Sequence, residues 1–369
     1  MLTRLTNCNT GGRITDIAVK DGKIADLTSC ANEPAEIIDV GGLHVYPGLV
    51  DIHAHGCMGY DTMDGEGESL LKMSEYLASH GTLSWLPTTM TEDFESIRRA
   101  VTAPLPTKGA EILGFHAEGP YISEKRKGAQ NGKYIKDPDF GEFKTLLSDK
   151  GVKIVTLAPE KEGSESFIKS CVSAGCVLSI GHTDADYDRT LAAADAGARC
   201  LTHVFNAMPG IHHRAPGPIG AAIDSDMYVQ VICDGLHIHK SVIKMLYRTF
   251  GPDRMILISD SMRATGLSDG RYMFGGQPVI VKDSIARTEA DGALAGSTST
   301  LFTCVKKAVE FGIPESDAFR MASATPSALM GFRRKGRLSV GCDADILAVD
   351  ENLGLRLIIK GGKTIFRDI

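Results

Sequence analysis

The sequence predicts an α/β protein in which a (β/α)8 barrel of the TIM type is joined to a small β-sandwich domain formed by both termini. From residue 43 onward, short apolar runs rich in β-formers alternate with segments of helical period, the pattern of βα units around a parallel sheet. Each run ends in a cluster of polar residues, and the terminal segments instead show hairpin patterns. The expected division is a barrel over 43–336, with 1–42 and 337–369 forming the two parts of the small domain.

Eight apolar runs supply the strands of the predicted barrel. In chain order they are "LHVYPGLVDIHAHG" from 43, "LSWLPTTM" from 83, "ILGFHAEGP" from 112, "VKIVTLAPE" from 152, "CVLSIGHTD" from 176, "RCLTHVFNAM" from 199, "YVQVICDGLHIH" from 228 and "RMILISDSM" from 254. Helices are expected between them, for example over 187–198 and over 68–81, where apolar residues fall close to a single stripe. In such a barrel, catalytic groups gather at the C-terminal ends of the strands.

The two terminal segments predict antiparallel hairpins. Asp21-Gly22 separates "ITDIAVK" from "KIADL", and Gly361-Gly362 separates "LRLIIK" from "KTIF". Pairs that contain glycine suit two-residue hairpin turns. We expect the two segments to pair with each other.

Composition and charge exclude several functions. The chain has 369 residues, 43% of them hydrophobic and 23% charged, with a formal net charge of -6. Its lysines and arginines are dispersed, which argues against a nucleic-acid surface or a membrane-binding basic helix. No apolar stretch approaches the roughly 18 residues of a membrane span, and the first residues lack the apolar region of a signal peptide, so a cytoplasmic protein is expected.

The nine cysteines are scattered without CxxC spacing. Reduced thiols in the core are therefore expected, rather than a disulfide framework or a thiolate metal site. Cys57, close to a histidine pair, is the cysteine that merits a test.

That pair, His53 and His55 in "DIHAH", indicates a metal site. Side chains alternate along a strand, so these two imidazoles point the same way. Five of the eight strand ends carry residues able to bind or serve a divalent cation, namely His53 and His55, Glu118, His182, His203 and Asp260. Singly, each has a structural explanation such as a helix cap or a buried hydrogen bond, but their recurrence at one level of the barrel favours a metal.

A metal held in this way activates water and polarises a carbonyl, which are the requirements for hydrolysing an amide or ester. Asp260 has the chemistry to take the proton of the water and deliver it to the leaving amine, with a role as a plain ligand as the alternative. The turn that contains Asn206 and Ala207 offers backbone N–H groups for an anion, with Arg214 and His237 nearby. An anionic substrate is implied, unless these residues only form turns and a solvated loop.

Motifs along the whole chain resemble those of the amidohydrolase superfamily, and within it the family that deacetylates N-acetylglucosamine 6-phosphate. They are "PGLVDIHAHG", "GFHAEGPYIS", "KGAQN", "TLAPE", "SIGHTDA", "THVFNAMPGIHHRAPG", "DGLHI", "ISDSM", "LAGST" and "GCDADILAVD". The resemblance implies hydrolysis of the N-acetyl group to give glucosamine 6-phosphate and acetate. It also implies one or two divalent metals per chain, with zinc expected first and iron, manganese or cobalt as alternatives.

The resemblance also implies a role for each matching position. Glu118, His182 and His203 would bind the principal metal, His53 and His55 a second one, and Asp260 would be the catalytic acid and base. The sugar phosphate would lie against Asn206, the backbone of Ala207, His237 and Arg214, with Arg214 reaching into the site of a neighbouring subunit, which implies a homodimer. Gln130 would donate a hydrogen bond to the acetyl carbonyl, a position where some members have histidine. Ser261 and Arg263 are expected to differ from relatives and to alter the sugar pocket.

Three alternatives remain open from the sequence. The substrate could be the epimer N-acetylgalactosamine 6-phosphate, because the orientation of one hydroxyl is decided by pocket contacts. A cyclic amidase would use a carboxylated lysine, whereas this chain offers Glu118 at that strand end. A catalytically silent protein that binds sugar phosphates would be recognised by ordinary ligand affinity without turnover.

Overall fold

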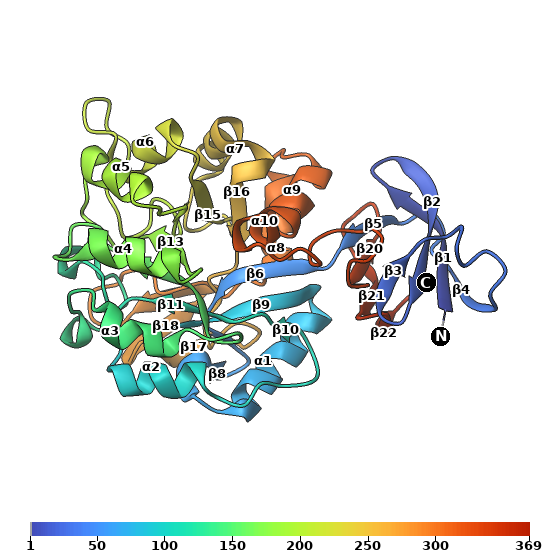
Figure 1. The fold of residues 1–369 in the computed structure, drawn as a ribbon, viewed down its shortest axis with the longest axis horizontal. Coiled ribbons are helices and arrows are strands. Elements are labelled where there is room, and N and C mark those ends of the chain that lie inside the picture. The colour runs from blue at the N-terminus through green and yellow to red at the C-terminus, as the bar shows by residue number, and fades with distance from the viewer. Residues whose placement is uncertain (1) are drawn as a thin grey trace.

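The eight apolar runs form the eight parallel strands of the barrel in the computed structural model, which describes residues 2–369 (Figure 1). The strands are β6 (Leu49–Ala54), β9 (Thr82–Thr89), β11 (Phe115–Glu118), β12 (Val152–Leu157), β13 (Val177–Ile180), β14 (Cys200–Leu201), β15 (Tyr228–Ile232) and β16 (Met255–Ile258). A short strand, β10 (Glu111–Ile112), also pairs with β9. Next to the last strand, the N–H of Asp260 donates to the carbonyl of His53 on the first strand at 2.9 Å, which brings the two ends of the sheet together.

Helices cover the outside of the barrel (Figure 1). They are α1 (Gly67–Ser79), α2 (Phe94–Val101), α3 (Phe140–Phe143), α4 (Ser164–Ser173), α5 (Tyr187–Asp195), α6 (Gly217–Asp224), α7 (Lys240–Arg254), α8 (Leu301–Glu310), α9 (Glu315–Met321) and α10 (Ala324–Met330). The stripe predicted over 68–81 is confirmed as the buried face of α1, which contains Leu70, Met73 and Leu77, while Leu71 is half-buried. Side-chain caps fix several helix starts; Asp93 before α2 and Asp186 before α5 each accept a backbone N–H.

Both termini contribute to a second sheet of eight strands, beside the barrel (Figure 1). Its strands are β1 (Leu2–Thr10), β2 (Arg13–Lys20), β3 (Lys23–Ala25), β4 (Ala35–Asp39), β5 (His44–Pro47), β20 (Ile346–Val349), β21 (Leu355–Lys360) and β22 (Lys363–Arg367). The two predicted hairpins are confirmed as β2–β3 and β21–β22. The sheet is mixed, however, because β1 pairs in parallel with β4 and β5. Its strands share one apolar cluster, to which Leu5, Ile38 and Leu357 belong.

A third sheet was not predicted. It consists of β17 (Gly270–Phe274), β18 (Gln277–Lys282) and β19 (Ile285–Thr288), all antiparallel. It follows the last barrel strand, and its turn at Gly275 packs close to Met90 and to the backbone of Ala129. A two-stranded ribbon, β7 (Gly56–Cys57) with β8 (Tyr60–Asp61), follows the first barrel strand.

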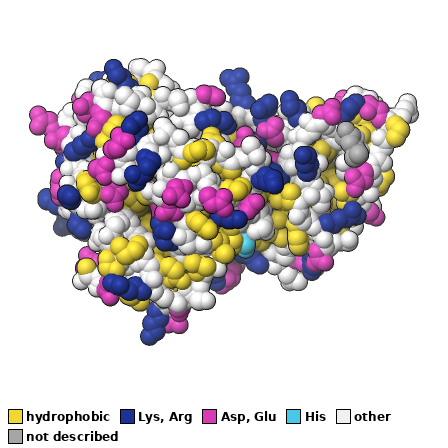
Figure 2. All heavy atoms as spheres, turned by 90° about the horizontal axis from the view of Figure 1, so that it is seen from below, with side chains coloured by type: hydrophobic (Ala, Val, Ile, Leu, Met, Phe, Trp, Pro, Cys, Tyr) yellow, Lys and Arg dark blue, Asp and Glu magenta, His cyan; other side chains and the backbone are white. Residues whose placement is uncertain are grey.

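Acidic and basic side chains are interspersed on the face seen in Figure 2. Within residues 2–369, none of the helices has both the length and the apolar character needed to cross a bilayer.

Candidate active site

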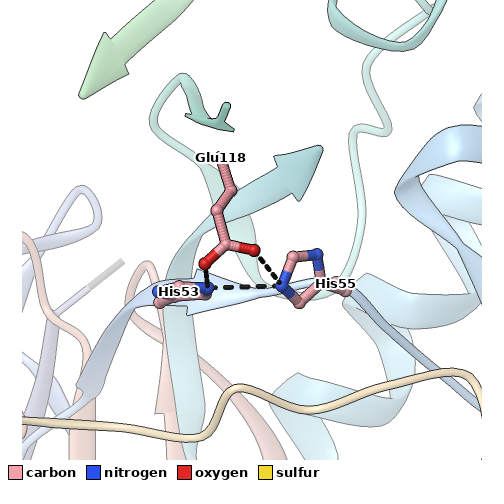
Figure 3. A group of neighbouring side chains, drawn as sticks. All are labelled: His53, His55 and Glu118. Atoms are coloured by element: carbon pink, nitrogen blue, oxygen red, sulfur yellow. Dashed lines mark hydrogen bonds and ion pairs between the residues drawn. The ribbon is translucent and has the colours of Figure 1, made fainter. Parts of the chain in front are cut away.

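The six strand-end residues singled out in the sequence converge at one end of the barrel. Potential ligand atoms of His53, His55 and Glu118 all lie within 4.8 Å of one another, as do those of Glu118, His182 and His203. Figure 3 shows Glu118 pointing toward His53, near the end of β6, and His55, just after it. Glu118 is thus shared by two groups, which we call the β6 group (His53, His55, Glu118) and the β13–β14 group (Glu118, His182, His203).

Oε1 of Glu118 faces three of the four imidazoles, and Oε2 faces the fourth. Its Oε1 lies 2.9 Å from His203 Nε2 and 3.4 Å from His182 Nε2. Its Oε2 lies 3.4 Å from His55 Nε2, while His53 Nε2 is 3.3 Å from Oε1. The carboxylate is therefore placed between the two sets of imidazoles.

Hydrogen bonds fix the orientation of three of the four imidazoles. His55 Nδ1 lies 3.1 Å from the carbonyl of Thr88, and His182 Nδ1 lies 2.9 Å from the carbonyl of Arg126. His53 Nδ1 lies 3.0 Å from Oε1 of Gln230. Because these partners are acceptors, each Nδ1 carries the proton and each Nε2 presents a lone pair to the site in the neutral ring.

This donor set fits a divalent cation. The Nε2 atoms of His53 and His55 are 3.2 Å apart, as are those of His182 and His203. Two lone pairs that face each other at this distance need a proton or a cation between them, and imidazole nitrogen with carboxylate oxygen is the ligand set of zinc and its neighbours. The residues of both groups therefore suit a metal.

The charges inside the site also favour a cation. Burial alone would lower the pKa of His55, but the carboxylates of Asp260 and Glu118 outweigh it and raise that pKa to about 10. Burial would raise the pKa of Glu118, but the imidazoles of His53 and His182 hold it well below its usual range. The site therefore holds ionised carboxylates that require compensating positive charge.

Asp260 lies against the β6 group. Its Oδ1 is 3.4 Å from His53 Nε2 and 3.3 Å from His55 Nε2. Its backbone, like those of His182 and His203, has a positive φ, between 28° and 47° for the three residues. Such strained conformations are uncommon outside glycine and cluster at functional sites.

A cavity of about 300 Å³ opens above these residues. Of the predicted substrate contacts, Gln130, Asn206, Ala207 and His237 line it, together with His55, Glu118, His182, His203 and Asp260. Arg214 does not line the cavity of its own chain. It lies in an exposed loop and contacts the ring of His213 at 2.7 Å.

Gln130 and His237 have defined partners. Gln130 Nε2 donates to Glu118 Oε2 at 2.5 Å, and its Oε1 accepts the N–H of Thr91 at 2.6 Å. His237 Nδ1 donates to Asp234 Oδ2 at 2.7 Å. Burial would lower the pKa of His237, but Asp234 outweighs it and raises that pKa. The raised pKa favours the cationic form of this imidazole, which suits an anionic ligand at the cavity wall.

Three further residues from the sequence lie away from the cavity. Ser261 accepts the backbone N–H groups of His55 and Gly56 through its carbonyl. Arg263 donates to the carbonyl of Gly59 and to Asp64. Neither is among the residues that line the cavity. Cys57 is buried, and burial raises the pKa of its thiol, so it is a core residue.

Sequence reasoning missed the residues that support the site. Gln230 orients His53, Asp234 orients His237, and Phe274 of the unpredicted third sheet packs edge-on against His55 with ring centroids 5.2 Å apart. A polar residue inside the apolar run "YVQVI" was the one available signal for Gln230.

Comparison with known proteins agrees with this geometry. The Amidohydrolase family matches residues 44–366. The chain is 39% identical over 366 residues to the N-acetylglucosamine-6-phosphate deacetylase of Bacillus subtilis (strain 168), covering 95% of this chain and 92% of the relative. It is 34% identical to the N-acetylgalactosamine-6-phosphate deacetylase of Escherichia coli O157:H7, covering 93% and 92%. A solved structure of a mutant N-acetyl-D-glucosamine-6-phosphate deacetylase from Mycobacterium smegmatis, in complex with N-acetyl-D-glucosamine-6-phosphate, superposes with a TM-score of 0.89 at 31% identity over 99% of both chains.

The barrel and its convergent histidines and carboxylates are those of a metal-dependent hydrolase, and the chain belongs to the amidohydrolase family. Within that family it groups with the N-acetylglucosamine-6-phosphate deacetylases, which it matches at 31–39% identity over nearly its full length.

Proposed function

We propose that the protein hydrolyses the acetamido group of N-acetylglucosamine 6-phosphate, giving glucosamine 6-phosphate and acetate. The observation that carries the proposal is a single cavity in which a shared carboxylate between two imidazole pairs, a further carboxylate and a histidine of raised pKa all meet. The named activities of the relatives support the substrate.

Glu118, His182 and His203 would bind the principal metal, and His53, His55 and Glu118 a second one. A bound divalent metal, which we propose to be zinc, supplies a polarised carbonyl and a water whose pKa falls to about 7. The hydrogen bonds to Nδ1 described above keep the Nε2 atoms available for this role.

Asp260 serves as general base and then as general acid. Its carboxylate accepts a proton from the attacking water while the water oxygen bonds to the carbonyl carbon. As the C–N bond breaks, the same carboxylate delivers the proton to the amine nitrogen, so acetate and the free amine leave. His237, Asn206 and the backbone of Ala207 hold the phosphate at the cavity wall. Gln130 fixes Glu118 and presents its amide to the acetyl end.

The proposal includes a cytoplasmic homodimer in which Arg214 completes the phosphate site of the partner subunit. Its exposed position outside the cavity of its own chain supports this assignment. We also propose the domain limits of 1–42, 43–336 and 337–369.

The first test is acetate release from N-acetylglucosamine 6-phosphate by the purified protein, before and after chelation and after zinc is added back. Metal content is measured on the same sample, and N-acetylgalactosamine 6-phosphate is assayed in parallel. Release that is lost on chelation and restored by zinc supports the proposal. Faster turnover of N-acetylgalactosamine 6-phosphate would make that sugar the substrate of the proposed function. If the metal-loaded protein releases acetate from neither sugar, the proposal is refuted.

A further inference from the structure

Gln230 is an isolated polar residue in the apolar strand β15. Its neighbours in the strand are Val229, Val231 and Ile232, and its side chain is completely buried. The amide Oε1 accepts the proton of His53 Nδ1 at 3.0 Å. Among the residues that the structure describes, the amide Nε2 has no nitrogen or oxygen hydrogen-bond partner, and the side chain otherwise interacts with the thiol of Cys200.

This arrangement carries a cost that the fold itself does not require. A buried amide N–H that lacks a nitrogen or oxygen acceptor destabilises a protein, because a thiol replaces its hydrogen bonds to water only weakly. An apolar side chain would fill the same position in the strand without that cost. The contact between Oε1 and His53 is therefore the feature that the glutamine provides.

The partner of His53 also differs in kind from the partners of the other oriented histidines. His55 and His182 are held by the backbone carbonyls of Thr88 and Arg126, whereas His53 is held by a side chain. A substitution can remove the support of His53 while it leaves the support of the other two in place.

We propose that Gln230 is a positioning residue for metal binding by the β6 group. Its hydrogen bond keeps the proton of His53 on Nδ1, so that Nε2 faces His55 Nε2 at 3.2 Å and Glu118 Oε1 at 3.3 Å with its lone pair free. Partners of this kind fix the tautomer and ring orientation of a histidine ligand, and their loss costs about 10- to 100-fold in metal affinity. Gln230 thereby governs the occupancy of the β6 group and leaves the β13–β14 group unaffected. The inference rests on the metal binding proposed above.

The test is a titration of metal-free protein with Co²⁺, followed by its visible absorption, with metal content per chain measured after dialysis. Gln230→Met keeps the length of the side chain and removes the acceptor. We expect two binding steps in the wild type and, in this variant, a step weakened by about 10- to 100-fold while the other stays unchanged. Gln230→Glu keeps an acceptor for His53 and adds negative charge. The binding step that weakens in Gln230→Met should therefore be at least as tight in Gln230→Glu as in the wild type.

Thr156→Val is the matched control. Thr156 is equally buried in the barrel and is hydrogen-bonded to His116 and Thr202, neither of which belongs to the two groups. The control should lose stability yet keep both binding steps.

Four results would overturn the inference. The first two are a single Co²⁺ binding step in the wild type and unchanged Co²⁺ binding in Gln230→Met. The other two are a binding step weakened as much in Gln230→Glu, or in Thr156→Val, as in Gln230→Met. Deacetylation by a wild type with one metal would leave the proposed function standing without the inference. Two Co²⁺ binding steps in the wild type, one of them weakened in Gln230→Met, without acetate release would support the inference and refute the proposed function.

Discussion

The backbone N–H of Asp260 donates to the carbonyl of His53 at 2.9 Å, and Oδ1 of the same aspartate lies 3.4 Å from His53 Nε2. Asp260 follows the last barrel strand, and His53 lies one residue before the end of the first one. One pair of residues therefore both closes the barrel and assembles the site. The carboxylate that we propose as the acid and base is positioned by main-chain hydrogen bonding as well as by its charge. A change in its side chain can therefore alter chemistry while the barrel stays closed.

Asp260→Asn should reduce kcat by about 10²- to 10⁴-fold, the range that general acid and base catalysis contributes. The amide keeps the shape of the side chain but cannot accept a proton from water. Binding of the sugar phosphate, measured by calorimetry, should be retained. Asp195→Asn, at an exposed position on α5, should behave as the wild type. Full activity in Asp260→Asn would rule out the acid and base role.

Glu118→Gln should reduce metal binding in both groups at once, because Glu118 belongs to each of them. The neutral amide leaves two pairs of imidazoles without the anion that offsets the charge of a cation. Metal content per chain after dialysis is the measurement. Glu92→Gln, a nearby half-buried carboxylate outside both groups, should keep wild-type content. Loss of only one equivalent from Glu118→Gln would show that the carboxylate is not shared.

Much of the barrel was predictable because its strands are short, buried and apolar, and each ends in polar residues at a common level. That periodicity survives even at β14, which has only two residues in strand conformation. The sheet β17–β19 was missed because it is inserted after the last barrel strand, where the βα pattern no longer applies. The parallel pairing of β1 with β4 was also missed, since local turn chemistry reports only on the hairpins that it connects.

The convergence of the candidate metal ligands was predictable because each lies at or just beyond the end of a strand, and strand ends meet in a barrel. Their supports were not, because they are set by tertiary contacts. Gln230 contacts His53 from another strand of the barrel. His55 is oriented by the backbone carbonyl of Thr88, and because every residue has a backbone carbonyl, the sequence gives no sign of this contact. Gln130 was expected to contact only the substrate, but it also donates to Glu118, a contact that depends on how its loop folds over the site.

KM for the phosphorylated substrate should rise with pH in both proteins, and in Asp234→Asn this rise should begin at a lower pH than in the wild type. Asp234 raises the pKa of His237, so the cationic imidazole persists to higher pH, and phosphate binding weakens as the pH rises through that pKa. Without the carboxylate the pKa of His237 falls, so the rise in KM moves to lower pH. At the pH where the two proteins differ most, KM of the variant should exceed that of the wild type by about tenfold. The measurement is the pH profile of KM and kcat, with kcat expected to change little. An unphosphorylated analogue serves as the control, because its KM should not respond. An unshifted KM profile would contradict the role of His237.

Lys335→Met should destabilise the junction between the barrel and the terminal sheet. The Nζ of this buried lysine lies 2.6 Å from Glu111 Oε2 and 2.9 Å from Asp345 Oδ2. Because Glu111 begins β10 and Asp345 precedes β20, these two contacts join the barrel to the terminal sheet. Removing one cation from this buried cluster costs up to about 3 kcal/mol, since Lys360, 2.9 Å from Asp345 Oδ2, is then left to offset that carboxylate. Lys169→Ala, which breaks an exposed pair with Glu165, should leave the unfolding free energy close to that of the wild type.

The effect of Lys335→Met should also depend on pH. Burial would raise the pKa of Asp345, but Lys360 and Lys335 outweigh it and lower that pKa. A depressed carboxyl pKa adds stability above the unfolded pKa of about 4, and this stability is lost as the pH falls through the folded value. The difference in unfolding free energy between wild type and variant, measured in urea, should therefore be largest near pH 7 and shrink below about pH 4. A variant no less stable than Lys169→Ala at pH 7 would show that Lys335 does not stabilise the junction.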